Sequence, residues 1–228
     1  MLKDTPGLLE GIPFILTSFS LSLINILLFV VLHRQIFLFL FLIFLILSVF
    51  TLYFFRDPDR ERELSKTDEF SRQVLSPADG RILDVKDIFE PKYLNCPTKR
   101  ISIFMSIFDV HVNRSPLEGR IEYLHYIPGR FLSAFKEKAS LDNEQVSVGI
   151  VKRTEGDINK KLMFTLIAGL IARRIVLWKR QSDMVRKGER IGMIRFGSRV
   201  DLFLPQEVEI VVAKGEKVFA GKTVIGYW

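Results

Sequence analysis

The sequence predicts a mainly β domain of β-rich α+β character, preceded by an N-terminal pair of transmembrane or hairpin helices. Two observations lead to this fold class. About the first quarter of the 228-residue chain is strongly apolar and poor in charge. From residue 74 onward, short apolar runs alternate with Gly, Pro, Asp and Asn, which is the pattern of strands joined by turns. We expect a membrane anchor of two helices over 1–55, a linker over 56–73 and the β-rich domain over 74–228.

Two stretches without a charged side chain form the expected anchor. Residues 12–32 and 35–55 are each 21 residues long, and only His33 and Arg34 separate them. A helix of this length spans about 31 Å, close to the hydrocarbon thickness of a bilayer. A cleaved secretory signal has one shorter apolar region and a small-residue cleavage site, which is not the pattern here. Because the link is so short, spanning helices and a hairpin that enters one leaflet both stay open.

The cations around the anchor predict its orientation. Arg56, Arg60, Arg62 and Lys66 follow the second stretch, whereas Arg34 is alone in the tip. The positive-inside rule therefore places both ends of the anchor in the cytoplasm. We expect the protein in the cell (inner) membrane, with the β-rich domain cytoplasmic.

Charge and cysteine content narrow the function classes. The net charge is +7, and beside a membrane anchor this favours anionic lipid surfaces. Without an aromatic-basic RNA signature or a recognition-helix motif, we expect no nucleic-acid partner. Cys96 is the only cysteine, so no intramolecular disulfide can form. The sequence has no Cys/His cluster that predicts a metal site.

The pattern of apolar runs predicts individual strands in the second part of the chain. A short helical turn is expected at 131–138, and 167–174 fits either a strand or a helix. The expected strands are 74–75, 81–85, 101–108, 119–126, 146–151, 162–167, 175–178, 208–212 and 224–228.

A Gly-Ser pair near the C-terminus is the most informative local feature. Gly197 and Ser198 lie between strand-like residues, flanked by Phe196 and Arg199. A glycine that interrupts a strand marks a bulge or a close approach of backbone or ligand. The stretch lacks the Gly-x-Ser-x-Gly form of a nucleophile elbow, which disfavours an α/β-hydrolase.

Four stretches follow one another along the chain. They are Ser76-Pro77-Ala78-Asp79-Gly80, the segment 108–116 around His111, the segment 168–176 and the stretch 195–205. Together they resemble the phosphatidylserine decarboxylase proenzyme family, in its short branch, and the similarity covers about 54–228. In order, they are similar to the family's upstream acidic turn, its histidine segment, the region upstream of its cleavage site and its processing site.

The resemblance implies a chain that cuts itself between Gly197 and Ser198. Ser198 would attack the carbonyl of Gly197, with His111 as the base and Asp79 orienting it. The resulting ester would undergo β-elimination, and hydrolysis would leave a pyruvoyl group from Ser198 and ammonia. The products would be a β chain of 1–197 and an α chain of 198–228 that stay associated.

The resemblance also implies the reaction. The pyruvoyl ketone would form a Schiff base with the amine of phosphatidylserine in the membrane, and loss of carbon dioxide would give phosphatidylethanolamine. His111 would return the proton, since longer relatives have a further histidine where this chain has Phe108. Arg199 and Arg173 are candidates for head-group contact. A homo-oligomer is compatible with this interpretation.

Three alternatives stay open at this stage. The same chemistry could act on another serine phospholipid, of the archaetidylserine ether-lipid type. A non-catalytic, membrane-tethered β module that binds lipid would remain one intact chain. A serine hydrolase that uses Ser198 without self-cleavage would also remain intact, and it would react with acylating probes.

Overall fold

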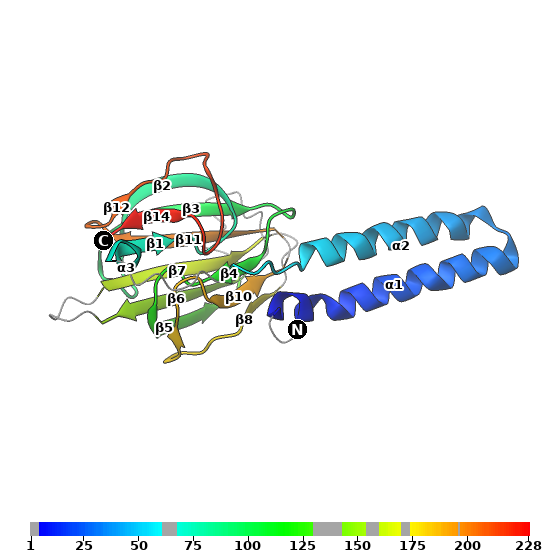
Figure 1. Ribbon diagram of the computed structural model, residues 1–228, viewed down its shortest axis with the longest axis horizontal. Coiled ribbons are helices and arrows are strands. Elements are labelled where there is room, and N and C mark those ends of the chain that lie inside the picture. The colour runs from blue at the N-terminus through cyan, green and yellow to red at the C-terminus, as the bar shows by residue number, and fades with distance from the viewer. Residues whose placement is uncertain (1–4, 61–67, 130–142, 154–159, 170–173, 196) are drawn as a thin grey trace. The chain divides into compact units, whose positions relative to one another are not determined.

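The computed structural model describes residues 5–60, 68–129, 143–153, 160–169, 174–195 and 197–228. These divide into two compact units, Met1–Pro58 and Asp59–Trp228 (Figure 1). The helical turn expected at 131–138 and the head-group candidate Arg173 lie outside the described residues.

The first unit is a helical hairpin. Helix α1 (Pro6–Leu32) and helix α2 (Gln35–Phe54) cover the two uncharged stretches. His33 has a left-handed φ of 50°, and its N–H donates to the carbonyl of Phe29, which closes α1. The reversal therefore needs only the two residues that interrupt the apolar pattern.

Burial in this hairpin is the reverse of that in a soluble protein. Large apolar side chains point outward, and Ile46 for example is 68% exposed. The buried side chains include small polar ones, namely Ser18, Ser22, Asn25, Ser48 and Thr51. The hydroxyl of Ser48 donates to that of Ser18 across the two helices at 2.9 Å. Small and polar residues at the helix contact are typical of helix pairs in lipid. Both helices are long and apolar enough to cross a bilayer, so they are compatible with membrane association.

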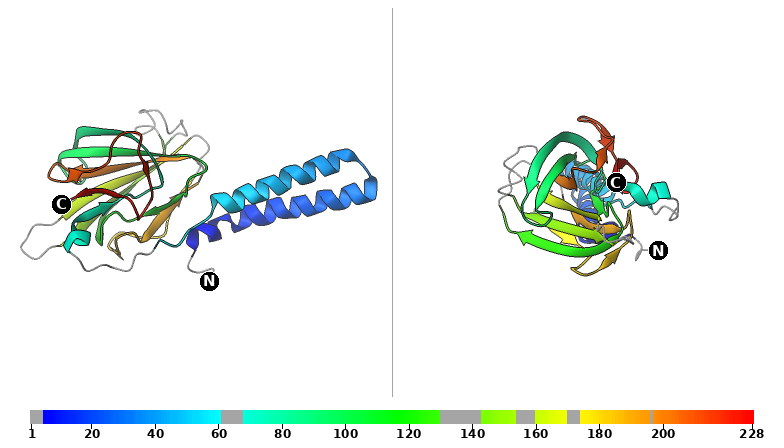
Figure 2. Two further views of the ribbon diagram at one scale, coloured as in Figure 1. Left: turned by 45° about the horizontal axis from the view of Figure 1, so that its top comes forward. Right: turned by 90° about the vertical axis from the view of Figure 1, so that its left-hand side faces the viewer.

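One large antiparallel sheet forms the framework of the second unit. Its strand order is β13-β2-β3-β11-β7-β6-β5-β9. The sheet curls around one of its own faces (Figure 2). Its strands are β2 (Gly80–Glu90), β3 (Cys96–Met105), β5 (Gly119–Ile127), β6 (Gln145–Lys152), β7 (Lys160–Ala168), β9 (Met184–Val185), β11 (Ser198–Pro205) and β13 (Lys217–Val218).

Two three-stranded sheets and a short helix complete this unit. The strand orders are β1-β14-β12 and β4-β10-β8. The elements are α3 (Asp68–Arg72), β1 (Gln73–Leu75), β4 (Val112–Arg114), β8 (Ile175–Leu177), β10 (Arg190–Ile194), β12 (Glu209–Ile210) and β14 (Val224–Tyr227).

The inner face of the large sheet forms the core. Side chains alternate along a strand, so every second residue of β11 points inward. Val200, Leu202 and Leu204 are fully buried there, among apolar side chains of β3 and β7. Because β11 pairs with β3 on one side and β7 on the other, its first residue, Ser198, lies in the interior.

The mainly β architecture and the two N-terminal helices confirm the predicted fold class, while several strand boundaries differ. The run expected at 81–85 is part of the longer β2, whose exposed residues include Lys86 and Asp87. Such polar residues hide the second half of the strand from an apolar-run pattern. The strand expected at 208–212 is only the two residues of β12. Strands β4 and β10 were not anticipated, and α3 falls within the expected linker.

Candidate active site

Ser198 begins β11 directly after a glycine with a left-handed backbone. It pairs with Met105 of β3 and Ala168 of β7, and it is fully buried. Gly197 has φ of +56°, a region that favours glycine. Among the described residues, a Cβ there would meet only Ile107, at an ordinary 3.8 Å. The backbone conformation, rather than lack of space, therefore explains the glycine.

The hydroxyl of Ser198 is only weakly held. Its Oγ donates to the sulfur of Met105 at 3.2 Å. A thioether is a weak acceptor, so this contact restrains the hydroxyl little. The arrangement leaves a buried nucleophile directly after a glycine in the left-handed region.

His111 follows a tight turn and leads into β4. The turn is closed by Asp109, whose N–H donates to Ser106 and whose carboxylate accepts from the N–H of Ser106, both at 2.8 Å. The carbonyl of His111 accepts from the N–H of Ile194, at the end of β10. Since Ile194 is four residues before Ser198, this contact brings the histidine segment to the processing segment.

The tautomer of His111 follows from its backbone contact. The ring is fully buried, and Nδ1 lies 3.0 Å from the carbonyl of Asp109. A carbonyl only accepts, so in the neutral ring Nδ1 carries the proton and Nε2 carries the lone pair. His111 is therefore presented as a base through Nε2.

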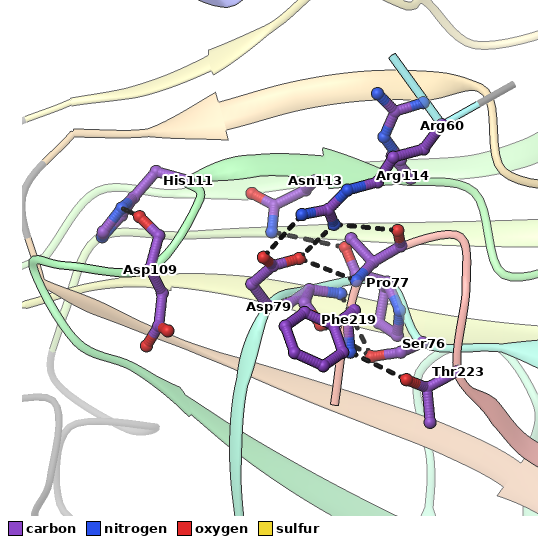
Figure 3. A network of polar contacts seen from close by, with 12 residues as sticks. Arg60, Ser76, Pro77, Asp79, Asp109, His111, Asn113, Arg114, Phe219 and Thr223 are labelled. Carbon is purple, nitrogen blue, oxygen red and sulfur yellow. Dashed lines mark hydrogen bonds and ion pairs between the residues drawn. The ribbon is translucent and has the colours of Figure 1, made fainter. Parts of the chain in front are cut away.

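Asp79 contacts an arginine instead of His111. Both its carboxylate oxygens accept from Arg60, with Nη2 and Oδ2 2.8 Å apart, and Oδ1 also accepts from the N–H of Ala220 at 2.8 Å. Figure 3 shows Asp79 at this arginine and His111 at the carbonyl of Asp109. A two-pronged guanidinium contact is stronger than one to a neutral imidazole. The direct orienting contact that the resemblance implies is absent here.

Arg60 joins three distant parts of the chain. Besides Asp79, its Nη1 donates to the carbonyl of Ala220 at 3.1 Å. The side chains of Arg60 and Asp79 are only 7% and 5% exposed. The acidic turn also contacts the C-terminal segment through the N–H of Ser76, which donates to Thr223 at 2.8 Å. The structure thereby ties the expected linker and the acidic turn to residues beyond the cleavage site.

Arg199 has a structural partner that sequence reasoning did not anticipate. It is 1% exposed, and its Nε donates to Asp201 at 2.6 Å. Its Nη2 donates to Asp201 at 3.1 Å and to the hydroxyl of Ser102 at 2.8 Å. A guanidinium with these hydrogen bonds is poorly placed to bind a head group. Arg199 is therefore not part of the proposed site.

Sequence reasoning also missed three residues near the site. Met105 and Asn113 have side chains that are fully buried, and Arg60 holds Asp79. Asn113 lies within the histidine motif, two residues after His111, which was the available signal. Nothing in the sequence distinguishes Arg60 from the other cations of the linker.

Comparisons with known proteins agree with the motifs. A family model described as phosphatidylserine decarboxylase matches residues 47–226. A phosphatidylserine decarboxylase proenzyme of Syntrophus aciditrophicus is 43% identical over 95% of this chain and 95% of its own. Proenzymes of Desulfotalea psychrophila and Carboxydothermus hydrogenoformans are 41% and 45% identical, over 98% and 81% of this chain and 97% and 83% of their own. This chain belongs to the phosphatidylserine decarboxylase family.

Proposed function

We propose that the chain converts phosphatidylserine to phosphatidylethanolamine and carbon dioxide, with a pyruvoyl group that it makes from its own Ser198. The observation that carries the proposal is the buried, weakly bonded hydroxyl of Ser198 directly after a glycine in the left-handed region. The same segment adjoins a histidine whose Nδ1 faces a carbonyl.

The self-cleavage needs only residues of this chain and one water. Nε2 of His111 takes the proton as Ser198 Oγ attacks the carbonyl carbon of Gly197, and the Gly197–Ser198 amide becomes an ester with a free amine. Removal of the Ser198 α-proton then breaks the bond from Cβ to the ester oxygen. Gly197 leaves as a carboxylate, and residue 198 becomes dehydroalanine. Water replaces its nitrogen, which departs as ammonia, and a pyruvoyl group remains.

The surroundings of Ser198 fit a pyruvoyl group. The Oγ of the serine is lost, and its Cβ becomes a methyl group. Met105 lies against that position, and a thioether packs well against a methyl. A pyruvoyl group held at this position would supply a ketone that can bind the substrate amine covalently and act as an electron sink for the loss of carbon dioxide. His111, through Nε2, returns a proton to the carbon that has lost the carboxylate.

The proposed α chain of 198–228 stays associated because its strands pair with the β chain of 1–197. β11 lies between β3 and β7, β13 pairs with β2, and β14 pairs with β1. The contacts of Arg60 and Asp79 with Ala220 cross the same boundary. Breaking one peptide bond leaves all of these contacts in place.

The proposed location follows the substrate. A phospholipid with two acyl chains stays in the bilayer, and the outward apolar side chains of α1 and α2 suit an anchor in the same bilayer. The excess of cations after α2 supports a β-rich unit on the cytoplasmic side. A site on that side would meet serine lipids of the inner leaflet.

A lipid assay tests the reaction. Purified full-length protein would receive phosphatidylserine, or an ether-linked serine lipid, in detergent micelles, with released carbon dioxide and the lipid product measured. We expect release from phosphatidylserine with the wild type and none above background with Ser198→Ala. His111→Gln should lose at least about 100-fold, the lower range for a general base. Folded wild type that releases no carbon dioxide from either lipid would contradict the proposal.

A further inference from the structure

Asn113 is a buried amide that makes only part of its hydrogen bonds. It lies in the middle of β4 and is fully buried. Its Nδ2 lies 3.5 Å from the carbonyl of Pro77 and 3.7 Å from the sulfur of Met105, both long contacts. Within the described part of the chain, its Oδ1 is buried without a hydrogen-bond partner.

The neighbouring carbonyl identifies which end of the amide lacks a partner. In Figure 3 the amide nitrogen of Asn113 points toward Pro77, and its oxygen points away from that turn. The reversed amide would place two oxygen acceptors against each other. The atom in need of a partner is therefore an acceptor, and it requires an N–H or O–H donor.

A buried acceptor without a hydrogen bond lowers the stability of the fold, so its presence indicates a function. Leaving a buried acceptor without a hydrogen bond costs about 1–3 kcal/mol, whereas an apolar side chain of the same shape avoids that cost. Asparagine and leucine are similar in shape. A buried polar group that the fold does not satisfy calls for a ligand, a water or a catalytic role.

Asn113 shares a neighbour with the proposed reactive residue. The sulfur of Met105 accepts from Ser198 Oγ and also contacts Asn113 Nδ2. His111 lies two residues earlier on the same segment. The unpartnered oxygen therefore belongs to the buried cluster in which Ser198 would become the pyruvoyl group.

We propose that Asn113 binds the amino group of the serine phospholipid, with Oδ1 accepting one of its N–H bonds. The inference rests on the proposed function. The amine is the donor of this head group, since the ionised carboxylate and the phosphate can only accept. Asn113 and Ser198 are both fully buried in the uncut chain. We expect cleavage of the 197–198 bond to open a path for the substrate to both. Asn113 thus selects lipids that carry an N–H donor.

The first test replaces the amide by an apolar side chain of the same shape. Full-length Asn113→Leu would be compared with wild type for self-cleavage, melting temperature, and kcat/KM on phosphatidylserine micelles. We expect normal self-cleavage, an equal or higher melting temperature, and a loss in kcat/KM of about 10- to 150-fold, as for a hydrogen bond to a charged group. Asn113→Asp keeps the acceptor but turns its second oxygen toward the carbonyl of Pro77, so it should recover only part of the loss.

Thr165→Val is the matched control. The Thr165 hydroxyl is buried and satisfied, because it shares a hydrogen bond of 2.9 Å with Ser147. This variant should melt below wild type and keep its kcat/KM. The inference is overturned if Asn113→Leu keeps a wild-type kcat/KM, melts below wild type or fails to fold, or no longer cuts itself, since these results give the amide a structural or processing role.

A second measurement needs no folded variant. The N,N-dimethyl analogue of phosphatidylethanolamine keeps one N–H donor when protonated but cannot form a Schiff base, and phosphatidylcholine offers no N–H. We expect the dimethylethanolamine lipid to inhibit wild type at least about tenfold more strongly than the choline lipid, one hydrogen bond's worth of affinity. Equal inhibition would overturn the inference while normal turnover of phosphatidylserine still supports the proposed function. Wild type that turns over no serine lipid would remove the proposed function, and this inference with it.

Discussion

The two faces of β11 differ in how fully their buried polar groups are hydrogen-bonded. On the outer face, the guanidinium of Arg199 donates to Asp201 and Ser102 at 3.1 Å or less. On the inner face, the hydroxyl of the preceding residue, Ser198, donates to the weakly accepting thioether of Met105. Adjacent residues of one strand thus differ in how fully the fold satisfies them.

This difference separates groups that hold the structure from groups available for chemistry. A buried charge must be paired to be tolerated, so Arg199 and Asp201 hold each other in place. A hydroxyl and an amide cost less when weakly bonded, so Ser198 and Asn113 can keep capacity for a reaction or a ligand. Function is expected at sites where buried polar groups lack their full set of hydrogen bonds.

The largest expected effect comes from breaking the pair on the outer face. Arg199→Met breaks the buried ion pair with Asp201, which should lower the free energy of unfolding by about 3–5 kcal/mol. Urea denaturation of the purified protein measures this. Arg186→Met is the control, because the Arg186 side chain is 60% exposed and its loss should change stability by about 0.5 kcal/mol or less.

The same variant also tests whether Arg199 contacts the lipid head group. If Arg199→Met were as stable as wild type and only raised KM for phosphatidylserine, the guanidinium would be a head-group ligand. The outer face of β11 would then belong to the site.

A smaller effect is expected at Asp79. Arg60→Met removes the two-pronged contact and leaves Asp79 with the N–H of Ala220. We expect the free energy of unfolding to fall by about 1.5–3 kcal/mol, as for loss of a hydrogen bond to a charged group. Arg60→Lys should recover part of this stability. Denaturant unfolding of the Ser198→Ala background keeps the chain uncut throughout. Unchanged stability would mean that this ion pair does not hold the acidic turn.

Replacing Lys187 is expected to change the pH dependence of stability. Burial lowers its pKa from 10.5 to about 8, despite the nearby carboxylate of Glu118. The unfolded chain then binds this proton more tightly than the folded one, so the charged form costs stability at neutral pH. The cost is relieved as pH rises from about 8 toward 10.5, and stability from this group rises over that window. Arginine has no such window, since it stays charged.

Unfolding of Ser198→Ala and its Lys187→Met derivative at pH 7, 8, 9 and 10 checks this. The second variant should lose the part of the upward slope that Lys187 contributes. Lys214→Met is the control, because Lys214 is exposed on a turn, and it should keep the slope. Identical slopes in all three proteins would show that Lys187 titrates as an ordinary surface lysine.

The sequence predicted the features that depend on local pattern. Uncharged runs predicted α1 and α2, and alternation predicted most strands, because both signals lie within about twenty residues. The Gly197-Ser198 junction and His111 were found from ordered motifs. Their expected relation to Asp79 differs in the structure, since the partner of Asp79 is Arg60, 19 residues away.

The remaining features depend on long-range pairing. In the sequence, Arg199 was a candidate for head-group contact beside the reactive serine. Only the register of β11 against β3 places it opposite Phe104, near Ser102. The unpartnered oxygen of Asn113 is equally invisible in sequence, because it depends on Pro77 and Met105 from two other segments. Whether a buried polar group finds a hydrogen-bond partner depends on how the strands pair in the folded sheet.

We propose that Ser198 becomes the pyruvoyl end of a new chain. Intact mass spectrometry of purified wild type beside Ser198→Ala tests this proposal. We expect wild type to give a chain of 1–197 and a chain of 198–228, the latter lighter by one ammonia than the same peptide with an N-terminal serine. Ser198→Ala should give one uncut chain. A single uncut mass for folded wild type, or a small chain that begins with an intact serine, would contradict the claim.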